Sequence, residues 1–301
     1  MNMLLVGSGA REHALARTIK KSSHCETLHC IASNMNPGMA QLCTEIVIDN
    51  INDPRTILKY AKEFNSSIVV IGPENPLGEG VSDVLDGEGI KVVGPKKQLA
   101  QIETSKSFAR DLLNEFGVPG GPQYKTFDSM ENVEGFLSDL KGGFVVKYDG
   151  LAGGKGVKVS GEHLHSNEDA LSYCQELVDA GGQFVVEEKF IGQEFSLMSL
   201  CDGTTLKHMP VVQDHKRAHE GDTGPNTGGM GAYSPTPLTT NELISKVENR
   251  IIVPVLEELE KSGNPYIGFL YVGIMIVEGD PYVIEFNVRM GDPETQVVIP
   301  L

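Results

Sequence analysis

Residues 144–160 read FVVKYDGLAGGKGVKVS, and this stretch decides how the rest of the chain is interpreted. A β-branched run enters a glycine-rich segment and an alternating run leaves it, which predicts two strands joined by a glycine loop. The loop does not match a Walker A phosphate loop, because Asp149 stands where that pattern needs glycine and Gly156 replaces its Ser or Thr. A strand, and not a helix, follows it.

Four glycines lie within residues 150–156 of this loop. Glycine loses more conformational entropy on folding than any other residue, so such a density needs a reason. We expect a flap that closes over a polyphosphate with its backbone N–H groups facing the ligand, while Lys147 and Lys155 add positive charge. A surface hairpin with solvated lysines is the plainer alternative.

Residues 281–289, PYVIEFNVR, alternate with a period of two. This predicts a strand whose core face carries Tyr282, Ile284, Phe286 and Val288. The other face carries three polar side chains, about 6.5–7 Å apart, from Glu285, Asn287 and Arg289. The carboxylate and the amide oxygen can reach one hard cation, and the guanidinium suits a carboxylate or phosphoryl oxygen. The alternative is a solvent-facing edge strand.

Residues 214–235 combine a basic triplet, His215-Lys216-Arg217, with the run DTGPNTGGMG at 222–231. We predict no regular element for this run, and backbone N–H groups that receive a phosphorylated or carboxylated ligand. An ordinary long loop is the alternative. Residues 184–194 predict a buried strand and a short connection whose backbone could border adenine; a strand edge with solvated acids explains them equally well.

Residues 1–103 alternate short strand-like and helical runs, which predicts a doubly wound parallel sheet. The expected strands are 3–6, 27–31, 45–48, 68–71 and 91–93, and the expected helices are 11–21, 54–64 and 81–85. The turn Gly7-Ser-Gly9 after the first strand favours an anion other than NAD, because Glu12 replaces the third glycine of the dinucleotide fingerprint. A tight turn that needs small residues is the alternative.

The rest of the chain predicts three further parts and gives an α/β and α+β fold overall. Residues 104–122 form a linker with a capped helix from Thr104. Residues 123–190 form a subdomain of strand hairpins around a helix at 167–180, and residues 191–301 form a core with longer strands and one helix at 240–262.

The composition narrows the class of protein. The net charge of the 301-residue chain is −16, which disfavours nucleic-acid binding. The first residues show no signal-peptide pattern and no apolar run reaches the length of a membrane span, so a cytoplasmic protein without a membrane partner is expected. Five scattered cysteines read as reduced thiols, and their spacing with His24 and His29 matches no common zinc pattern.

Taken together, these motifs resemble the ATP-grasp superfamily and, within it, the glycinamide ribonucleotide synthetases. The resemblance covers the whole chain. It rests on GSGAREHA at 7–14, GPENPL at 72–77, Ser105-Lys106 and the glycine loop; its most specific parts are QDHKR at 213–217, the 222–231 run and EFNVRMGDPE at 285–294.

The resemblance implies a ligase of purine synthesis that joins glycine to 5-phosphoribosylamine, with ATP as co-substrate and Mg²⁺ or Mn²⁺ as metal. It implies a Rossmann-like domain over 1–103, a lid subdomain over 123–190 and the metal and substrate site over 191–301. ATP contacts are implied at Lys106, Lys147, Gly153, Gly154, Lys155, Gly156, Glu187, Glu188, Phe190, Ile191 and Glu194. The metal would be held by Glu285 and Asn287.

Substrate contacts are implied at Gly9, Arg11, Glu12, His13, Lys216, Arg217, Asn226, Thr227, Gly228, Gly229 and Arg289. The catalytic groups would be Arg289, Asp214 and Lys155. The family continues into a C-terminal domain that this chain lacks, so we expect weak or no activity from the 301-residue form. A monomer is favoured. The open alternatives are another ATP-grasp carboxylate–amine ligase and a non-catalytic nucleotide-binding module.

Overall fold

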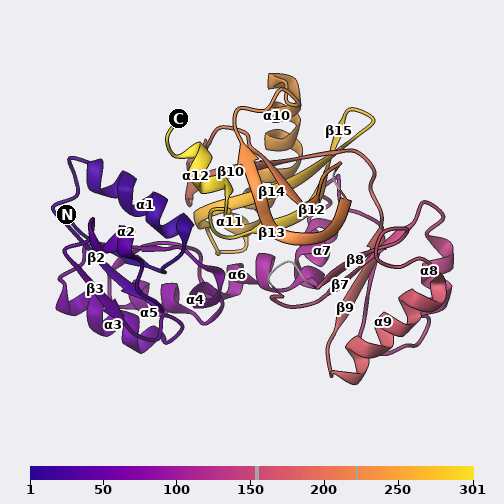
Figure 1. The fold of residues 1–301 in the computed structure, drawn as a ribbon, viewed down its shortest axis with the longest axis horizontal. Coiled ribbons are helices and arrows are strands. Elements are labelled where there is room, and N and C mark those ends of the chain that lie inside the picture. The colour runs from indigo at the N-terminus through magenta and orange to yellow at the C-terminus, as the bar shows by residue number, and fades with distance from the viewer. Residues whose placement is uncertain (153–155, 222) are drawn as a thin grey trace.

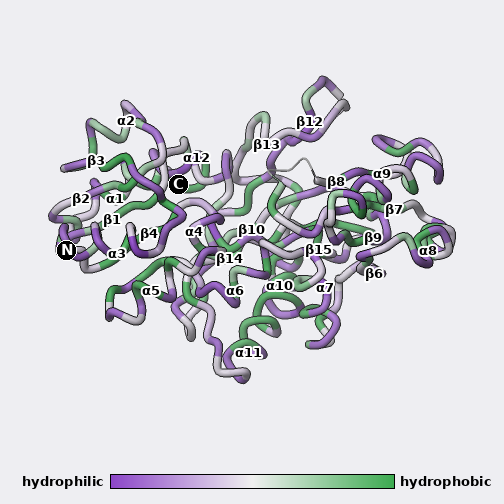
Figure 2. Tube along the Cα trace, turned by 90° about the horizontal axis from the view of Figure 1, so that it is seen from below, coloured by the Kyte–Doolittle hydropathy of each residue, from purple (hydrophilic) through white to green (hydrophobic). Residues whose placement is uncertain are grey.

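The computed structural model of this protein describes residues 1–152, 156–221 and 223–301. It has three parts arranged in a row, with the amino-terminal domain and a small lobe at the two ends and a large lobe between them (Figure 1). Each part has hydrophobic segments of its own (Figure 2). Within the described residues, no helix is long and apolar enough to cross a membrane.

The amino-terminal domain is the predicted parallel sheet, with strand order β3-β2-β1-β4-β5. Its strands are β1 (Asn2–Val6), β2 (Thr27–Ala32), β3 (Glu45–Ile48), β4 (Ile68–Ile71) and β5 (Lys91–Val93). Its helices are α1 (Ala10–Lys21), α2 (Pro37–Ala40), α3 (Pro54–Glu63), α4 (Glu74–Gly78) and α5 (Val81–Gly87).

Alternate residues of β1 are buried against opposite faces of this sheet. Leu4 joins the apolar cluster that contains Ile57 of α3 and Leu85 of α5. Leu5 joins a second cluster, with Leu15 of α1. Helices therefore cover both faces, as the alternation of strands and helices predicts.

The small lobe is a four-stranded antiparallel sheet, β6-β9-β7-β8, with two helices. Its elements are β6 (Tyr124–Phe127), α8 (Val133–Asp139), β7 (Phe144–Tyr148), β8 (Val157–Val159), α9 (Asn167–Asp179) and β9 (Phe184–Glu188). It has a separate apolar core, which includes Leu137, Phe144 and Phe184.

The large lobe is a second antiparallel sheet, β11-β10-β14-β15, and a two-stranded ribbon, β12-β13. The sheet contains β10 (Gln193–Asp202), β11 (Leu206–His208), β14 (Ile267–Val277) and β15 (Asp280–Asn287). The ribbon pairs β12 (Gln213–His219) with β13 (Thr223–Tyr233). The helices are α10 (Asn241–Val247), a π-helical turn (Glu248–Ile252), α11 (Val253–Lys261) and α12 (Glu294–Val298), the last of which packs against α1.

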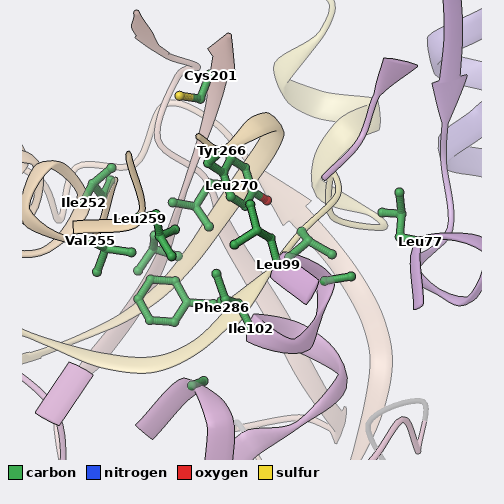
Figure 3. Packing of buried hydrophobic residues seen from close by; sticks show 14 of the residues in the cluster. Leu77, Leu99, Ile102, Cys201, Ile252, Val255, Leu259, Tyr266, Leu270 and Phe286 are labelled. Carbon is green, nitrogen blue, oxygen red and sulfur yellow. The ribbon is translucent and has the colours of Figure 1, made fainter. Parts of the chain in front are cut away.

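Two helices connect the amino-terminal domain to the lobes, α6 (Lys97–Thr104) and α7 (Lys106–Glu115). Leu99 and Ile102 of α6 point into the core of the large lobe, beside Leu270 and Phe286 (Figure 3). One continuous apolar cluster therefore joins the amino-terminal domain to the large lobe. The linker helix was expected over residues 104–120, and both ends were wrong, because Thr104 closes α6, Ser105 caps α7, and α7 ends at Glu115.

Two further expectations about local structure were wrong. The run at 222–231 is not irregular, because its described residues from Thr223 onward form β13. In β15 the pairing shifts from Gly273–Glu285 to Ile274–Val283, so Ile284 is an extra residue in the strand. This β-bulge reverses the alternation. As a result Val283, and not Ile284 or Tyr282, lies in the core with Phe286 and Val288.

The segment after α7 runs along the open side of β15. Val283 N–H donates to the Gly120 carbonyl over 2.7 Å. Gly120 has φ +91°, and a Cβ there would lie 2.8 Å from the Pro281 carbonyl oxygen, so the close approach requires glycine. This segment carries the chain from the large lobe into β6 of the small lobe.

Candidate active site

Three buried charged side chains meet where α7, the small lobe and the large lobe come together. The Arg110 guanidinium of α7 binds both carboxylate oxygens of Glu187 on β9, over 2.8 and 3.2 Å. Lys147 of β7 forms an ion pair with the same carboxylate. Both cations also donate to the carbonyl of Ile284, the bulge residue of β15, Arg110 over 2.5 Å and Lys147 over 3.0 Å.

All three side chains of this cluster are less than 10% exposed. Burial lowers the pKa of Lys147, since the charged ammonium loses hydration. The Arg110 and Lys147 cations oppose the effect of burial on Glu187 and hold the pKa of its carboxyl below its usual value. The cluster is thus a paired set of ions, with one net positive charge.

The start of α7 is tied to the glycine loop by Asp149. Its carboxylate accepts the backbone N–H of Ser107 over 3.2 Å and also receives the N–H of Lys106 and the hydroxyls of Ser105 and Ser107. A carboxylate at a helix N-terminus satisfies N–H groups that have no partner within the helix. The Lys106 ammonium bonds to the carbonyl of Gly150, so two predicted phosphate-binding lysines, Lys106 and Lys147, flank the start of the loop.

Glu285 and Asn287 of β15 follow Ile284, the residue whose carbonyl Lys147 reaches, and both carry side-chain oxygen atoms. The Lys216 ammonium of β12 lies 3.2 Å from the Glu285 carboxylate and, as the largest influence, lowers its pKa to about 2. Asn287 Oδ1 accepts from Arg289 over 3.2 Å. An ionised carboxylate and an amide oxygen on one strand fit a hard divalent cation whose other ligands are phosphate oxygens and water. Among the described residues, no group of three or more His, Cys, Asp or Glu side chains could hold a metal alone.

Arg289 connects this strand to the amino-terminal half of the chain. Its guanidinium lies 2.8 Å from the Glu103 carboxylate of α6 and 3.3 Å from that of Glu74 on α4. Glu103 also accepts the N–H of Val288 over 2.7 Å. Arg289 is therefore held from two sides beside the predicted metal ligands.

Asp214 of β12 has an unusual environment. Its Oδ1 atom is buried and has no hydrogen-bond partner among the described residues. Burial, with a contribution from Glu294, raises the pKa of this carboxyl to about 7. Gly229 lies against it, since a Cβ there would be 3.1 Å from Asp214 Oδ1 and 2.4 Å from Pro293. The structure thus brings together three predicted site segments at 214, 229 and 293.

The ribbon exposes the predicted acceptor-binding run as a bulge. The pairing jumps from His215–Gly231 to Arg217–Asn226, which leaves residues 227–230 outside the regular register. Thr227 donates to the Lys216 carbonyl over 2.9 Å and accepts the N–H of Gly229 over 3.1 Å, which fixes the shape of the bulge. Gly228 lies within it, beside Gly229.

Arg217 points from the ribbon to the small lobe. Its guanidinium forms an ion pair with Glu162, which follows β8, and donates to the Gly224 carbonyl over 3.0 Å. Lys189, just after β9, binds the same carboxylate over 2.9 Å. This contact connects the ribbon to the small lobe.

The amino-terminal turn is occupied by its own helix. The Glu12 carboxylate accepts the N–H of Gly9 over 2.6 Å and pairs with Arg11 over 2.6 Å, and both side chains are buried. Arg11 also donates to the Met290 carbonyl over 3.2 Å, so it joins α1 to the segment after β15. His13 is partly exposed and packs over Gly38. The anion at this helix N-terminus is therefore Glu12 itself.

The remaining predicted ATP contacts lie around β9 and β10. Glu188 accepts the N–H of Gln123 over 2.8 Å, and the Phe190 ring packs against Tyr282 with centroids 4.7 Å apart. Ile191 is 74% exposed, while Glu194 lies in β10, opposite Met275. Gly156 marks the end of the glycine loop, and Gly153, Gly154 and Lys155 lie outside the described residues.

Sequence reasoning missed four residues that shape this site: Arg110, Asp149, Glu74 and Glu103. Glu74 was quoted within a motif but given no role. A buried arginine on the helix after Ser105-Lys106 offers no periodic signal, because its partner Glu187 is 77 residues away. Asp149 could have been recognised as a capping residue only with knowledge that the glycine loop meets the start of α7.

Two family models match this chain and together cover nearly all of it. The N domain of phosphoribosylglycinamide synthetase matches residues 1–103, and the ATP-grasp (A) domain of phosphoribosylglycinamide synthetase matches residues 104–295. The chain belongs to the phosphoribosylglycinamide synthetase family. The ATP-grasp resemblance drawn from the glycine loop and the 285–294 motif is thereby confirmed.

Curated relatives in this synthetase family are similar over the whole chain. The phosphoribosylamine–glycine ligase of Methanosarcina barkeri is 43% identical over 305 residues, which include all of this chain and 70% of the relative. That of Rhodopirellula baltica is 40% identical and is covered over 69% of its length. The chain thus spans about 70% of the length of these synthetases.

Solved structures of synthetases support the same fold. The crystal structure of phosphoribosylamine–glycine ligase from Thermotoga maritima superposes with a TM-score of 0.84 at 31% identity, over all of this chain and 72% of that one. N5-carboxyaminoimidazole ribonucleotide synthetase from Thermus thermophilus gives a TM-score of 0.72 over 97% of this chain and 72% of that one. At 19% identity, that second likeness concerns the fold alone.

Proposed function

We propose that this chain catalyses the ATP-dependent joining of glycine to 5-phosphoribosylamine, with ADP, phosphate and 5-phosphoribosylglycinamide as products. Family membership and relatives called phosphoribosylamine–glycine ligase support the reaction. One structural observation carries the site: Lys147 reaches the carbonyl of Ile284, the residue before Glu285. The proposed phosphate-binding lysine of one lobe is thus adjacent to the strand of the other lobe that carries the proposed metal ligands.

The chemistry has two steps. The glycine carboxylate attacks the γ-phosphorus of ATP, which gives glycyl phosphate and releases ADP. The amine of phosphoribosylamine then attacks the acyl carbon, phosphate leaves, and the nitrogen loses a proton as the amide forms. The protein positions the three substrates and neutralises charge on the transferred phosphoryl group, so no protein nucleophile is needed.

Each part of the site has a proposed task in this sequence. Lys106, Lys147 and Lys155 contact the ATP phosphates, and the segment from Glu187 to Ile191, with Glu194, borders the nucleoside. Arg289, held by Glu74 and Glu103, faces the transferred group. The ribbon residues Lys216, Arg217, Asn226, Thr227, Gly228 and Gly229 receive phosphoribosylamine. In the Gly9–His13 turn, the exposed Gly9 and the partly exposed His13 are the proposed contacts, while the buried Arg11 and Glu12 shape the turn.

Asp214 is the proposed acceptor of the amine proton. Its carboxyl has one oxygen with no partner among the described groups, and its raised pKa, about 7, suits proton exchange near neutral pH. Glu285 and Asn287 would hold Mg²⁺ or Mn²⁺, which supplies charge neutralisation to the phosphates when bound. A cytoplasmic monomer remains the expectation from sequence.

A substrate panel tests the reaction. ADP release should require glycine and phosphoribosylamine together, and serine or alanine should not replace glycine. Glu285→Gln should abolish turnover while nucleotide binding partly remains. ADP release with another amino acid would favour a different ATP-grasp ligase, and nucleotide binding without any turnover would favour a binding module.

A further inference from the structure

The junction of α7 with the two lobes contains a buried arginine to which the proposed reaction gives no task. Arg110 is 3% exposed, and its guanidinium bonds only to groups of the protein among the described residues. It makes three hydrogen bonds, two to Glu187 on β9 and one to the Ile284 carbonyl on β15. A guanidinium that bonds to both lobes at once is more than a surface ion pair.

We propose that Arg110 is a positioning residue of the ATP site, which fixes Lys147 and the metal-binding strand relative to each other. This inference rests on the proposed function of Lys147 and Glu285. It adds a residue that touches neither nucleotide nor metal and that acts through its two neighbours.

Arg110 acts on Lys147 through the carboxylate that they share. Glu187 binds Arg110 with both carboxylate oxygens, and Lys147 pairs with the same carboxylate. Because Arg110 balances part of the negative charge of Glu187, this carboxylate does not fully neutralise Lys147, which can also attract a phosphate. Without Arg110, Glu187 has Lys147 as its one remaining cation in this cluster, and the ammonium is drawn toward the carboxylate.

Arg110 also bonds to the bulge in β15. Ile284 is the inserted residue, and its carbonyl accepts from Arg110 and from Lys147. A bulge carbonyl leaves the regular ladder and needs donors elsewhere. Because Glu285 follows directly, the donors that fix the Ile284 carbonyl also fix where the Glu285 carboxylate begins.

The geometry of these bonds requires an arginine side chain at position 110. Lysine could keep the charge at position 110 but has no planar fork, so it cannot bind both oxygens of Glu187 and reach the Ile284 carbonyl together. Position 110 therefore needs arginine in particular, which separates positioning from simple neutralisation of charge.

The test compares Arg110→Lys and Arg110→Met with Tyr124→Phe. The control removes a hydrogen bond between α7 and β6, Tyr124 to Asp111 over 2.6 Å, without touching Lys147 or Ile284. Thermal unfolding and circular dichroism establish that each variant folds. Isothermal titration with Mg·ADP then measures nucleotide binding, and steady-state rates give KM for ATP and for glycine separately.

We expect Arg110→Lys to weaken Mg·ADP binding and to raise the KM for ATP by about tenfold or more, since charged hydrogen bonds are lost. The KM for glycine of Arg110→Lys should stay within about twofold of wild type. In the Tyr124→Phe control, Mg·ADP binding and both KM values should also stay within about twofold of wild type. Because removal of both partners of a buried pair costs less than removal of one, the double variant Arg110→Met/Glu187→Gln should bind nucleotide better than the two single losses multiplied together imply.

Several results would overturn the inference. They are unchanged nucleotide binding in a folded Arg110→Lys protein, an equal rise in both KM values, or single losses that simply multiply in the double variant. The binding experiment needs no turnover. If wild type binds Mg·ADP but makes no phosphoribosylglycinamide, the proposed function fails, while the role of Arg110 is still decided by binding.

Discussion

At the scale of single residues, Gly72 shows how a side chain far along the sequence selects glycine. A Cβ at Gly72 would lie 2.2 Å from Glu12 Oε1, and Glu12 is held by Gly9 and Arg11. Gly72→Ala should therefore lower the free energy of unfolding by about 1–3 kcal/mol, as in other overpacked sites. Urea unfolding measures this. Gly87→Ala, with open space around its Cβ, should be neutral or slightly stabilising, and equal losses in the two variants would contradict the explanation.

Asp214 predicts a pH dependence of stability. Its folded pKa, about 7, lies above its ordinary value of 3.8, so the folded state holds the proton more tightly. This stabilisation is complete below pH 4 and is lost as pH rises toward 7. Asparagine does not titrate, so Asp214→Asn does not lose this stabilisation as pH rises. The stability of the variant relative to wild type should therefore increase between pH 5 and pH 8 by about 1–2 kcal/mol, a range reduced for the partial exposure of Asp214. Urea unfolding at the two pH values tests this, and a constant difference would show that the carboxyl titrates normally.

Individual residues differ in how well sequence predicted them. Glu285 and Asn287 share a face of one strand, which alternation alone suggests. Arg110 and Glu103 act on residues 77 and 185 positions away, and no local pattern records such distances. The pairing of Glu12 with its own helix start was also hidden, because the same residues could equally receive a bound anion.

At the scale of elements, Asp149 directly follows β7 and its carboxylate accepts N–H groups at the start of α7. Asp149→Asn keeps the shape but weakens the bonds to Lys106 and Ser107, and should cost about 1–2 kcal/mol of stability. Since Lys106 opens α7, the KM for ATP should rise as well. Asp169→Asn is a matched control, because Asp169 belongs to the capping box of α9 inside the small lobe and its carboxylate accepts the N–H of Ser166 over 3.1 Å. It should lower stability similarly with an unchanged KM for ATP, and a rise in KM in both variants would contradict the specific role of Asp149.

Elements with strong periodicity were predicted almost to the residue, as β3, β4 and β5 show. The failures have physical causes. The bulge at Ile284 inserts one residue, so a rule that counts in twos assigns the wrong core face. The glycine-rich run of β13 has low strand propensity, and it forms a strand because β12 supplies its hydrogen-bond partners.

At the scale of the whole molecule, the apolar cores predict how the protein unfolds. One cluster runs from β1 to β15 through α6, while the small lobe has its own. Calorimetry should therefore resolve two transitions. Leu137→Ala should destabilise the small-lobe transition and Ile102→Ala the other, each by about 2–5 kcal/mol. A single transition that both variants shift equally would show that the lobes unfold together.

The sequence predicted the parallel domain and the change to antiparallel structure after it, because alternation of strands and helices has few topological solutions. It could not predict that α6 would insert Leu99 and Ile102 into the large lobe. That packing depends on how two finished units fit together, and neither unit's own pattern contains it.

The separate core of the small lobe bears on how nucleotide enters. Because the small lobe has its own apolar core, it can move as a unit without exposing that core to water. Resistance to this movement therefore comes from a few polar contacts with the rest of the protein. Two of these contacts differ in exposure. The Arg110–Glu187 ion pair is buried, and the Arg217–Glu162 ion pair is partly exposed to water. Dissolved salt screens the partly exposed ion pair far more than the buried one. Higher ionic strength should therefore increase the fraction of molecules in which the Arg217–Glu162 contact is broken, while the Arg110–Glu187 pair stays formed.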